Sequence, residues 1–311
     1  MIEDQQKLFK QACFIRAFEH ELAAQFDQGE VPGLLHLCTG AEVAETLLAS
    51  LLDNKIDMMT GSHRSHGLAL AMGADPVLVA MEILGRKGGL SDGLAGTQHI
   101  IAPEAGFLTS NGIVGAQVPI AAGAALTAKT QKTGGIAVAV FGEGAANQGA
   151  VLETMNLAVA LKLPLLFVLE NNGFAQSTPQ ERVTGDQSYA DRAKGFGLEV
   201  FEADSFAVAA CLDCFRQAVS HVREGLPAFV EVYVSRLNGH YHTDYEFYRP
   251  NKNDFDPLIV WEQTLLADGM PEPADAIESD TWRSAREVVE QALAAENAGQ
   301  AQLAPWVGVS G

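Results

Sequence analysis

Three short, almost wholly apolar runs constrain the fold of this chain more than any other feature. Each has the length of a strand, and they cover residues 136–141, 164–169 and 229–234. Segments whose apolar residues recur at helical spacing lie before and between them, at residues 115–130, 147–161 and 205–223. Strands that are apolar on both sides and alternate with helices are typical of a parallel sheet with helices on both faces. The predicted fold class is therefore α/β, a parallel sheet flanked by helices.

Helices are also predicted on either side of this alternating region. Residues 5–27 form the first of them, and two more follow Thr39-Gly40 and Asp75-Pro76. Residues 85–113 are rich in glycine and form a long irregular segment, a kind of loop that is usually either functional or disordered. The sequence has no repeat or linker, so residues 1–311 are expected to form one domain. It would carry an N-terminal helix and an acidic, solvated helical tail over about 256–311.

Charge and composition exclude several classes of partner. The chain has 39 acidic and 20 basic residues, a net charge of −19, which argues against a nucleic acid or an anionic membrane as its main partner. No apolar run approaches the roughly 18 residues of a membrane helix. The start of the sequence is polar and acidic, unlike a signal peptide, so a cytoplasmic protein is expected. Cys211 and Cys214 fall within a predicted amphipathic helix and are expected to be structural thiols.

The segment Phe141-Gly-Glu-Gly-Ala-Ala-Asn-Gln-Gly149 joins a buried strand to a helix. Open parallel sheets bind ligands at such junctions, where glycines let the backbone approach a phosphate and the helix N-terminus supplies N–H groups. A dinucleotide site is one alternative, with Glu170 at the end of the next strand. However, the third glycine of that motif is replaced by Asn147, which weakens the interpretation.

A second polar segment, Glu170-Asn-Asn-Gly173, follows the next apolar strand. If the two strands are neighbours, Glu143 and Asn172 lie at the same edge of the sheet. A carboxylate, an amide oxygen and a backbone carbonyl, completed by diphosphate oxygens, form a suitable set of ligands for Mg²⁺. Taken alone, Asn-Asn-Gly is a turn sequence, but the two segments together are far more specific.

With these two segments, the chain resembles the α subunit of the first component of 2-oxo acid and acetoin dehydrogenases, which binds thiamine diphosphate. Gly142-Glu-Gly144 with Asn171-Asn172 is similar to the thiamine diphosphate motif of that family. Further similar segments occur in family order over roughly residues 10–250, namely Gly61-Ser-His-Arg-Ser-His-Gly67, Gly96-Thr-Gln-His99, Gly112-Ile-Val-Gly-Ala-Gln117, Leu161-Lys-Leu-Pro164 and Arg236-Leu-Asn-Gly-His240. The resemblance implies a thiamine diphosphate-binding fold that holds the diphosphate side of the cofactor.

The resemblance also implies roles for individual residues. The metal ligands would be Glu143, Asn172 and the carbonyl of Phe174, holding Mg²⁺. Contacts to the cofactor would come from His63, Arg64, Gly112, Val114, Gly144, Ala145 and His240, with Arg64 at the diphosphate and the backbone of Gly112 and Val114 at the aminopyrimidine. Candidate catalytic residues are His240, His99 and His66.

Two single positions and the stretch Tyr241-His-Thr243 depart from the family pattern, and three further histidines are left outside the site. Glu143 stands where most relatives have aspartate, and His63 stands where tyrosine is usual. These changes affect the expected substrate more than the expected cofactor. Three of the other histidines, His36, His221 and His242, are interpreted as structural or solvated.

The activity implied is cleavage of a 2-oxo acid or an acyloin, with transfer of the acyl unit to lipoamide on a lipoyl-bearing acyltransferase. Because only the diphosphate half of a site is matched, a β subunit in an α₂β₂ heterotetramer is expected to complete it. Two alternatives stay open at this point. One is a carboligase of a biosynthetic pathway that uses the same cofactor, and the other is a non-catalytic relative that binds partners but no cofactor.

Overall fold

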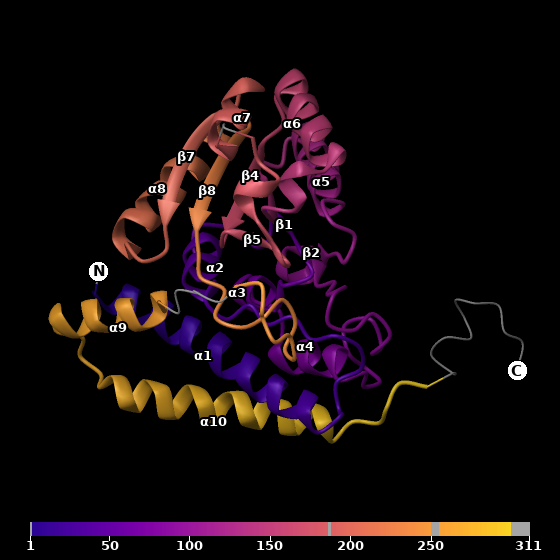
Figure 1. Ribbon diagram of the computed structural model, residues 1–311, viewed down its shortest axis with the longest axis vertical. Coiled ribbons are helices and arrows are strands. Elements are labelled where there is room, and N and C mark those ends of the chain that lie inside the picture. The colour runs from indigo at the N-terminus through magenta and orange to yellow at the C-terminus, as the bar shows by residue number, and fades with distance from the viewer. Residues whose placement is uncertain (1, 186–187, 250–254, 300–311) are drawn as a thin grey trace, which may run out of the picture.

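Six parallel strands form the central sheet of the computed structural model, which describes residues 2–185, 188–249 and 255–299. The strands are β1 (Met58–Gly61), β2 (Phe107–Ser110), β3 (Ala137–Gly142), β4 (Leu165–Asn171), β7 (Glu199–Asp204) and β8 (Ala228–Tyr233). Their spatial order is β2-β1-β3-β4-β8-β7, and every neighbouring pair is parallel. Helices lie on both sides of this sheet (Figure 1). The predicted α/β fold with a parallel sheet is therefore confirmed.

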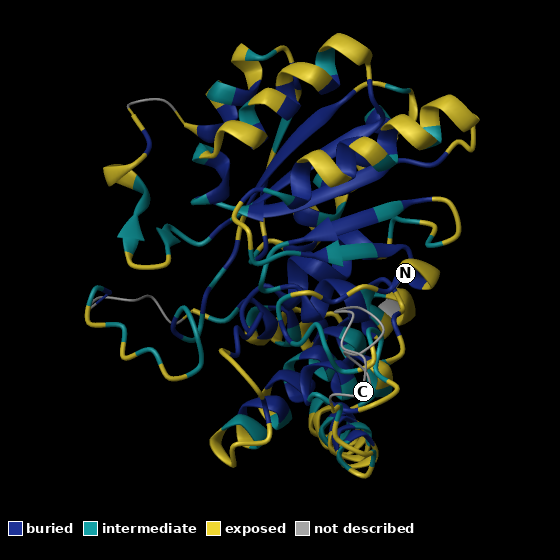
Figure 2. Cartoon of the chain, turned by 90° about the vertical axis from the view of Figure 1, so that its right-hand side faces the viewer, coloured by how far each residue is buried: buried dark blue, intermediate teal, exposed yellow. Residues whose placement is uncertain are grey.

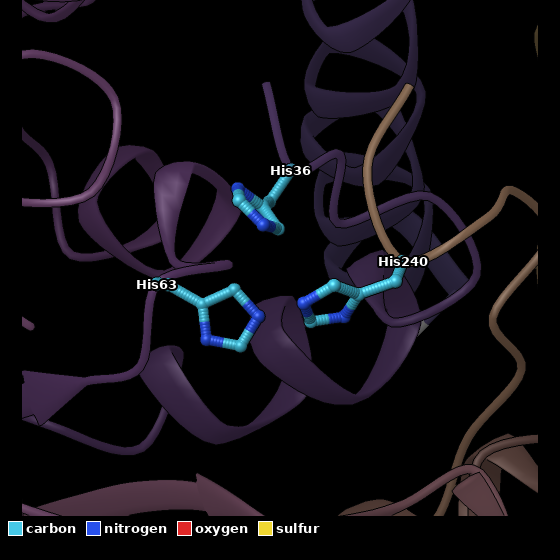
Figure 3. A group of neighbouring side chains, drawn as sticks. All are labelled: His36, His63 and His240. Atoms are coloured by element: carbon cyan, nitrogen blue, oxygen red, sulfur yellow. The ribbon is translucent and has the colours of Figure 1, made fainter. Parts of the chain in front are cut away.

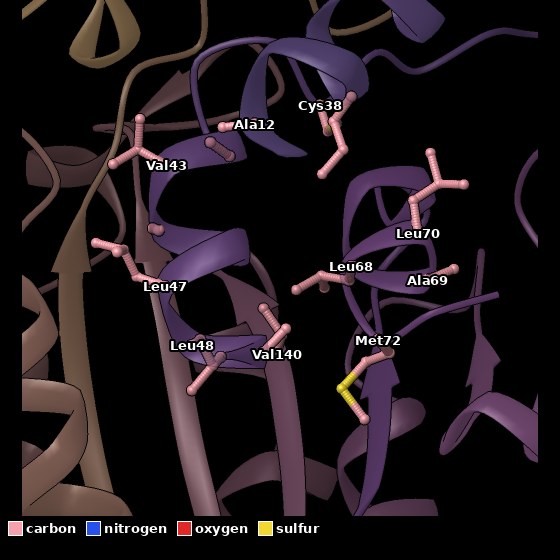
Figure 4. Close-up of a cluster of buried hydrophobic side chains, with 14 of the residues drawn as sticks. Ala12, Cys38, Val43, Leu47, Leu48, Leu68, Ala69, Leu70, Met72 and Val140 are labelled. Atoms are coloured by element: carbon pink, nitrogen blue, oxygen red, sulfur yellow. The ribbon is translucent and has the colours of Figure 1, made fainter. Parts of the chain in front are cut away.

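Both faces of the sheet are buried, and alternate residues of each strand point to opposite faces. On one face, Val138 and Val140 pack with the helices α2 (Glu42–Ala49), α3 (His66–Ala71) and α8 (Val208–Arg223) (Figure 4). On the other face, Phe141 packs with α5 (Gln117–Gln131), α6 (Gly149–Leu161) and α7 (Tyr189–Gly195). Figure 2 shows the buried strands between helices whose outer faces are exposed. Burial on both sides explains why the central strands lack a polar alternation in the sequence.

Three strands of the sheet have no clear signal in the sequence. β1 and β2 contain four residues each, too few to show a periodic pattern. β7 lies at the edge of the sheet, and several of its residues are polar and exposed. Edge strands are covered less than central ones, so their sequences carry less of the apolar character on which strand prediction depends. A two-stranded antiparallel ribbon, β5 (Phe174–Ala175) and β6 (Thr178–Pro179), follows β4.

The C-terminal helices pack against the first helix rather than standing free in solvent. α1 (Ile2–Asp27) is contacted by α9 (Pro257–Ala267) and by α10 (Ala274–Leu293), which lies along it (Figure 1). Trp261 on α9 is 1% exposed and its ring lies 5.6 Å from that of Phe9. α10 buries Ile277 and Val289, so only one face of the acidic tail is solvated. Residues 300–311 of the predicted tail lie outside the described residues.

The remaining helix of this layer, α4 (Pro76–Ile83), begins after Asp75, whose side chain accepts the backbone N–H of Val77 as an N-cap. The acidic side chain of Glu82 then organises the glycine-rich segment that follows α4. Its two carboxylate oxygens accept the backbone N–H groups of Ser91, Gly93, Ala95 and Gly96. This buried carboxylate fixes a loop with few apolar residues of its own.

None of the described helices combines the length and apolar character needed to cross a bilayer.

Arg16 joins three parts of the chain at the buried side of α1, and replacing it should destabilise the fold strongly. Its guanidinium donates to the carboxylates of Glu42, which is 0% exposed, and of Asp256. In an Arg16→Met variant both carboxylates lose their cation, and removal of one partner of a buried pair costs about 3–5 kcal/mol. Urea unfolding followed by circular dichroism measures this free energy.

An exposed arginine provides the matched control for this measurement. Arg283 pairs with Asp280 on the outer face of α10, and both side chains are more than half exposed. An Arg283→Met variant should lose less than about 1 kcal/mol. Equal losses in the two variants would show that the Arg16 contacts contribute no more than a surface pair.

Candidate active site

A pocket of about 410 Å³ lies at the C-terminal ends of β1, β3, β4 and β8. Residues from all four strand ends line it, together with the segment after β2 that begins at Asn111. The volume is within the range of about 300–1,000 Å³ typical of small-molecule sites. This edge of the sheet is where parallel α/β folds bind their ligands.

Glu143 directly follows β3 and is 1% exposed. Its Oε1 accepts the backbone N–H groups of Asn172 and Phe174, the latter at 3.2 Å. Within the described residues, the carboxylate has no ion pair, and burial raises the pKa of Glu143 to about 7. The Oδ1 atom of Asn172 points into the same turn and accepts the N–H of Phe174 at 3.2 Å. The two oxygen-bearing side chains that the sequence predicts as metal ligands therefore lie together.

The turn after β3 is held by side chains from α7. Tyr189 donates its hydroxyl to the carbonyl oxygen of Glu143 at 3.4 Å, and Arg192 donates to the carbonyl of Ala146 at 3.1 Å. Asn147 occupies the position of the missing third glycine, and its side chain donates to the carbonyl of Glu143 at 3.2 Å. Asn147 therefore stabilises a turn that differs from that of a dinucleotide-binding motif.

Gly144 and Ala145 lie where the backbone turns toward the pocket. A Cβ atom on Gly144 would lie 3.0 Å from the Cβ of Ala175, closer than side chains normally pack. Both residues line the pocket, so their backbone is accessible to a ligand. Glycine at position 144 thus permits a close approach between the turn after β3 and the ribbon after β4.

Two guanidinium groups, that of the half-buried Arg64 and that of the buried Arg236, give this acidic chain a basic pocket wall. Arg64 donates to the carbonyl oxygens of Leu37 and of His240, the latter at 2.8 Å. Burial and the neighbouring Arg236 lower the pKa of Arg64 to about 10. Arg236, which is not among the predicted site residues, donates to the carbonyl of Gln176 at 3.2 Å. A pocket with two cations suits a ligand that carries negative charge.

The segment from Arg236 to Arg249 is held in place by its own hydrogen bonds. Asp244 accepts the backbone N–H of His240 at 2.9 Å and the hydroxyl of Tyr248. Arg249 donates to the carbonyl of Arg236 at 2.9 Å. These bonds hold the segment in which His240 lines the pocket.

Three histidines from separate segments meet in this pocket, as Figure 3 shows. The rings of His36 and His63 lie 4.7 Å apart, those of His36 and His240 4.9 Å, and those of His63 and His240 5.2 Å. Burial and the neighbouring Arg64 lower the pKa values to about 3 for His36, about 2 for His63 and about 4 for His240. The interpretation of His36 as structural or solvated is incomplete, because this residue lines the pocket. No local pattern marks it, since only the fold brings the three segments together.

The two other candidate histidines do not line the pocket. His66 is fully buried, with Nδ1 2.7 Å from Oε1 of Glu19 and Nε2 2.7 Å from the hydroxyl of Thr97. Both of its nitrogens are thus used to join α1, α3 and the glycine-rich loop. His99 is exposed and lies beside Gly112, where an added Cβ atom would be 3.5 Å from the imidazole ring. A catalytic role for His66 or His99 stays a prediction without support from this geometry.

Gly112 and Val114 line the pocket on the side of β2. Val114 is 52% exposed and its neighbour Ile113 69% exposed, so this wall presents apolar side chains to solvent. The predicted backbone contacts to an aminopyrimidine would lie here.

Glu170 also lines the pocket, although sequence reasoning assigns it only to the dinucleotide alternative. It is aligned with Gly142 of the neighbouring strand, and burial raises its pKa to about 8. Behind it, burial and the nearby Glu170 raise the pKa of Glu45 well above its usual range. Glu170 could have been identified as a pocket residue from the sequence, because it is a carboxylate at the end of an otherwise apolar strand.

Comparison with known proteins places the chain in a family. Residues 10–302 match the model of the dehydrogenase E1 component family. The α subunit of acetoin:2,6-dichlorophenolindophenol oxidoreductase from Cupriavidus necator is 35% identical over 97% of this chain and 93% of that subunit. The E1 component α subunit of pyruvate dehydrogenase from Zymomonas mobilis is 37% identical over 87% of this chain and 78% of that subunit.

The chain belongs to the dehydrogenase E1 component family, and the resemblance inferred from its motifs is confirmed. This family implies thiamine diphosphate as cofactor, and the pocket fits that group. Glu143 and Asn172 offer oxygen ligands for a hard cation, and Glu143 has no competing cation among the described residues. Arg64 and the turn at Gly144 suit a diphosphate.

Proposed function

We propose that this chain is the α subunit of a thiamine diphosphate- and Mg²⁺-dependent dehydrogenase that acts with a β subunit. Its substrate is a 2-oxo acid or an acyloin such as acetoin, and its acyl unit passes to lipoamide. The observation that carries the proposal is the pairing of Glu143 with the backbone of Asn172 across β3 and β4, beside a basic pocket. We propose the whole chain, residues 1–311, as one thiamine diphosphate-binding domain.

Different residues of the pocket would bind the metal ion and the diphosphate. Glu143, Asn172 and the carbonyl of Phe174 would hold Mg²⁺, while Arg64 and the N–H groups of Gly144 and Ala145 would bind the negatively charged diphosphate. The bound cofactor supplies a carbanion that adds to a carbonyl and serves as an electron sink.

His63 and His240 would lie near the part of the pocket where the substrate reacts. The low pKa values of His63 and His240 keep both imidazoles neutral at pH 7, so each offers one N–H donor and one lone pair as a hydrogen-bond acceptor. The exposed apolar wall at Ile113 and Val114 is where the β subunit would complete the site. Such placement at a subunit boundary is common for cofactor pockets.

Calorimetry with thiamine diphosphate, with and without Mg²⁺, tests the cofactor assignment. The chain, alone or with its β subunit, should bind thiamine diphosphate only when Mg²⁺ is present. Turnover of pyruvate and of acetoin, measured with an artificial electron acceptor, then identifies the substrate. Absence of binding in every combination would contradict the proposal.

A His240→Ala variant should lose turnover by roughly 100-fold or more, the scale expected for loss of general acid–base assistance. Its cofactor affinity should fall much less, because Arg64 and the metal ligands stay in place. Steady-state kinetics of the assembled enzyme measure the first quantity and calorimetry the second. His221→Ala is the control, because its ring packs beside Phe201, on α8 and away from the pocket. Unchanged turnover would show that His240 has no catalytic role.

A further inference from the structure

We propose that His36, His63 and His240 form a binding site for one divalent transition-metal ion of the Zn²⁺ type, separate from the predicted Mg²⁺ ligands. The three side chains come from the α1–α2 connection, the β1–α3 connection and the segment after β8. One ligand nitrogen from each can be chosen so that all three lie within 4.8 Å of one another. Figure 3 shows the rings directed toward a shared space.

The geometry is close to that of a three-histidine site. A Zn–N bond of about 2.1 Å in a tetrahedral arrangement places neighbouring nitrogens about 3.4 Å apart. The nitrogens must therefore close by about 1.4 Å at most, which side-chain rotations of His63 and His240 can supply because both are incompletely buried. Three histidine ligands leave a fourth position for water, an arrangement that zinc sites use.

The hydrogen bonds around the cluster leave nitrogen lone pairs available. Nδ1 of His36 lies 3.2 Å from the carbonyl oxygen of Leu34, which accepts, and 3.4 Å from Nε2 of Gln98, which donates. A neutral imidazole keeps one lone pair in either tautomer, and the shorter contact to the carbonyl favours the proton on Nδ1 and the lone pair on Nε2. A histidine that donates its other N–H to a backbone carbonyl is the usual arrangement around a bound metal. Nε2 of His63 is buried without a hydrogen-bond partner in the described part of the chain. A buried nitrogen of this kind gains most from a ligand.

Charge decides the type of ion and limits its affinity. Neutral imidazoles suit Zn²⁺, Co²⁺, Ni²⁺ and Cu²⁺, whereas Mg²⁺ prefers oxygen ligands such as those at Glu143. Burial and Arg64 favour the neutral form of all three rings, so no proton has to leave before a metal binds at pH 7. The same Arg64, with Arg236, repels a cation, which makes the site weaker than an isolated three-histidine site.

Occupation of this site has a consequence for the proposed function. His63 and His240 are also predicted to contact the cofactor, so an ion held between them would block the reacting end of the pocket. Zn²⁺ should therefore act as an inhibitor of the assembled enzyme. The binding test itself uses the full chain without thiamine diphosphate, so its result does not depend on the proposed activity.

Co²⁺ is the probe, because its visible absorption reports both binding and coordination geometry. Titration of the full chain in excess Mg²⁺ should show one Co²⁺ per chain with the intense bands of a tetrahedral site, displaced by Zn²⁺. His63→Phe and His240→Phe should each weaken binding by more than about 100-fold, beyond the 10–100-fold typical of lost outer-shell contacts. The matched control His221→Phe, on α8, should bind as the unaltered chain does.

Two results would overturn the proposal. One is the absence of stoichiometric Co²⁺ binding in the unaltered chain, and the other is binding that survives both pocket substitutions. Circular dichroism checks that each variant folds. If one fails to fold, X-ray absorption of the Zn²⁺-loaded unaltered chain decides instead, since it must show three imidazole ligands. Fewer than three imidazoles would contradict the assignment.

Discussion

A Glu143→Ala variant is expected to lose Mg²⁺-dependent binding of thiamine diphosphate, with affinity at least about 100-fold lower. Loss of an outer-shell partner already costs a metal site 10–100-fold, and Glu143 would be a direct anionic ligand. Its carboxylate is positioned by the N–H groups of Asn172 and Phe174. Calorimetry of the variant with cofactor and Mg²⁺ measures the change.

A neighbouring glutamate separates this effect from a general loss of negative charge. Glu153 is exposed on α6, and Glu153→Ala should leave the affinity for thiamine diphosphate unaltered. The Glu143 variant should still fold, because the raised pKa of Glu143 shows that its charged form is disfavoured by burial. Cofactor binding at the unaltered level would refute the assignment of Glu143 as a metal ligand.

The isolated chain is expected to be inactive, with turnover restored only when a β subunit is added. The described residues contain one large sheet, and the residues predicted to hold the cofactor all lie at one edge of it. On the β2 side of this pocket, Ile113 and Val114 are left exposed beside Gly112. The resemblance implies that the partner supplies a glutamate that activates the aminopyrimidine. Without that acid–base group, turnover should fall by about 10²–10⁴.

The test compares the chain alone, the β subunit alone and the two together, each assayed with an artificial electron acceptor. Circular dichroism of the isolated chain shows whether it is folded, so that inactivity is not confused with unfolding. An Ile113→Asp variant adds a structural readout, because a charge in the exposed apolar wall should weaken assembly in analytical ultracentrifugation. Full activity from the isolated chain would place the activating group within these 311 residues.

The central part of the fold was predictable because its signals are local. β3, β4 and β8 are apolar throughout, since helices cover both faces of the sheet. β7 could not be found in the same way, because an edge strand keeps polar and exposed residues. The acidic tail shows a related limit. The sequence predicted two helices there, but their packing on α1 depends on a surface that lies more than 200 residues away.

The residues of the candidate site also separate into those with a local signal in the sequence and those without one. Glu143 and Asn172 were predicted to lie together because each follows a buried strand, and neighbouring parallel strands end at the same edge. The family resemblance added Arg64 and His240, which the structure brings to the same pocket. His66 was a candidate through the same resemblance, yet Glu19 and Thr97 use both of its nitrogens in the interior. Local sequence therefore does not distinguish a histidine that faces a pocket from one that faces the core, because either can stand beside a glycine.

The sequence by itself predicted the parallel α/β sheet and the edge at which Glu143 and Asn172, the proposed metal ligands, lie together. These follow from residue patterns within single segments, in which burial and turn chemistry act over a few neighbouring residues. Only the tertiary structure decided that His36, His63 and His240 converge, that Glu170 faces the pocket and that His66 does not. Each of these depends on the order of the strands in the sheet and on contacts between distant loops. Such contacts arise from the packing of the whole chain and leave no periodic pattern along it.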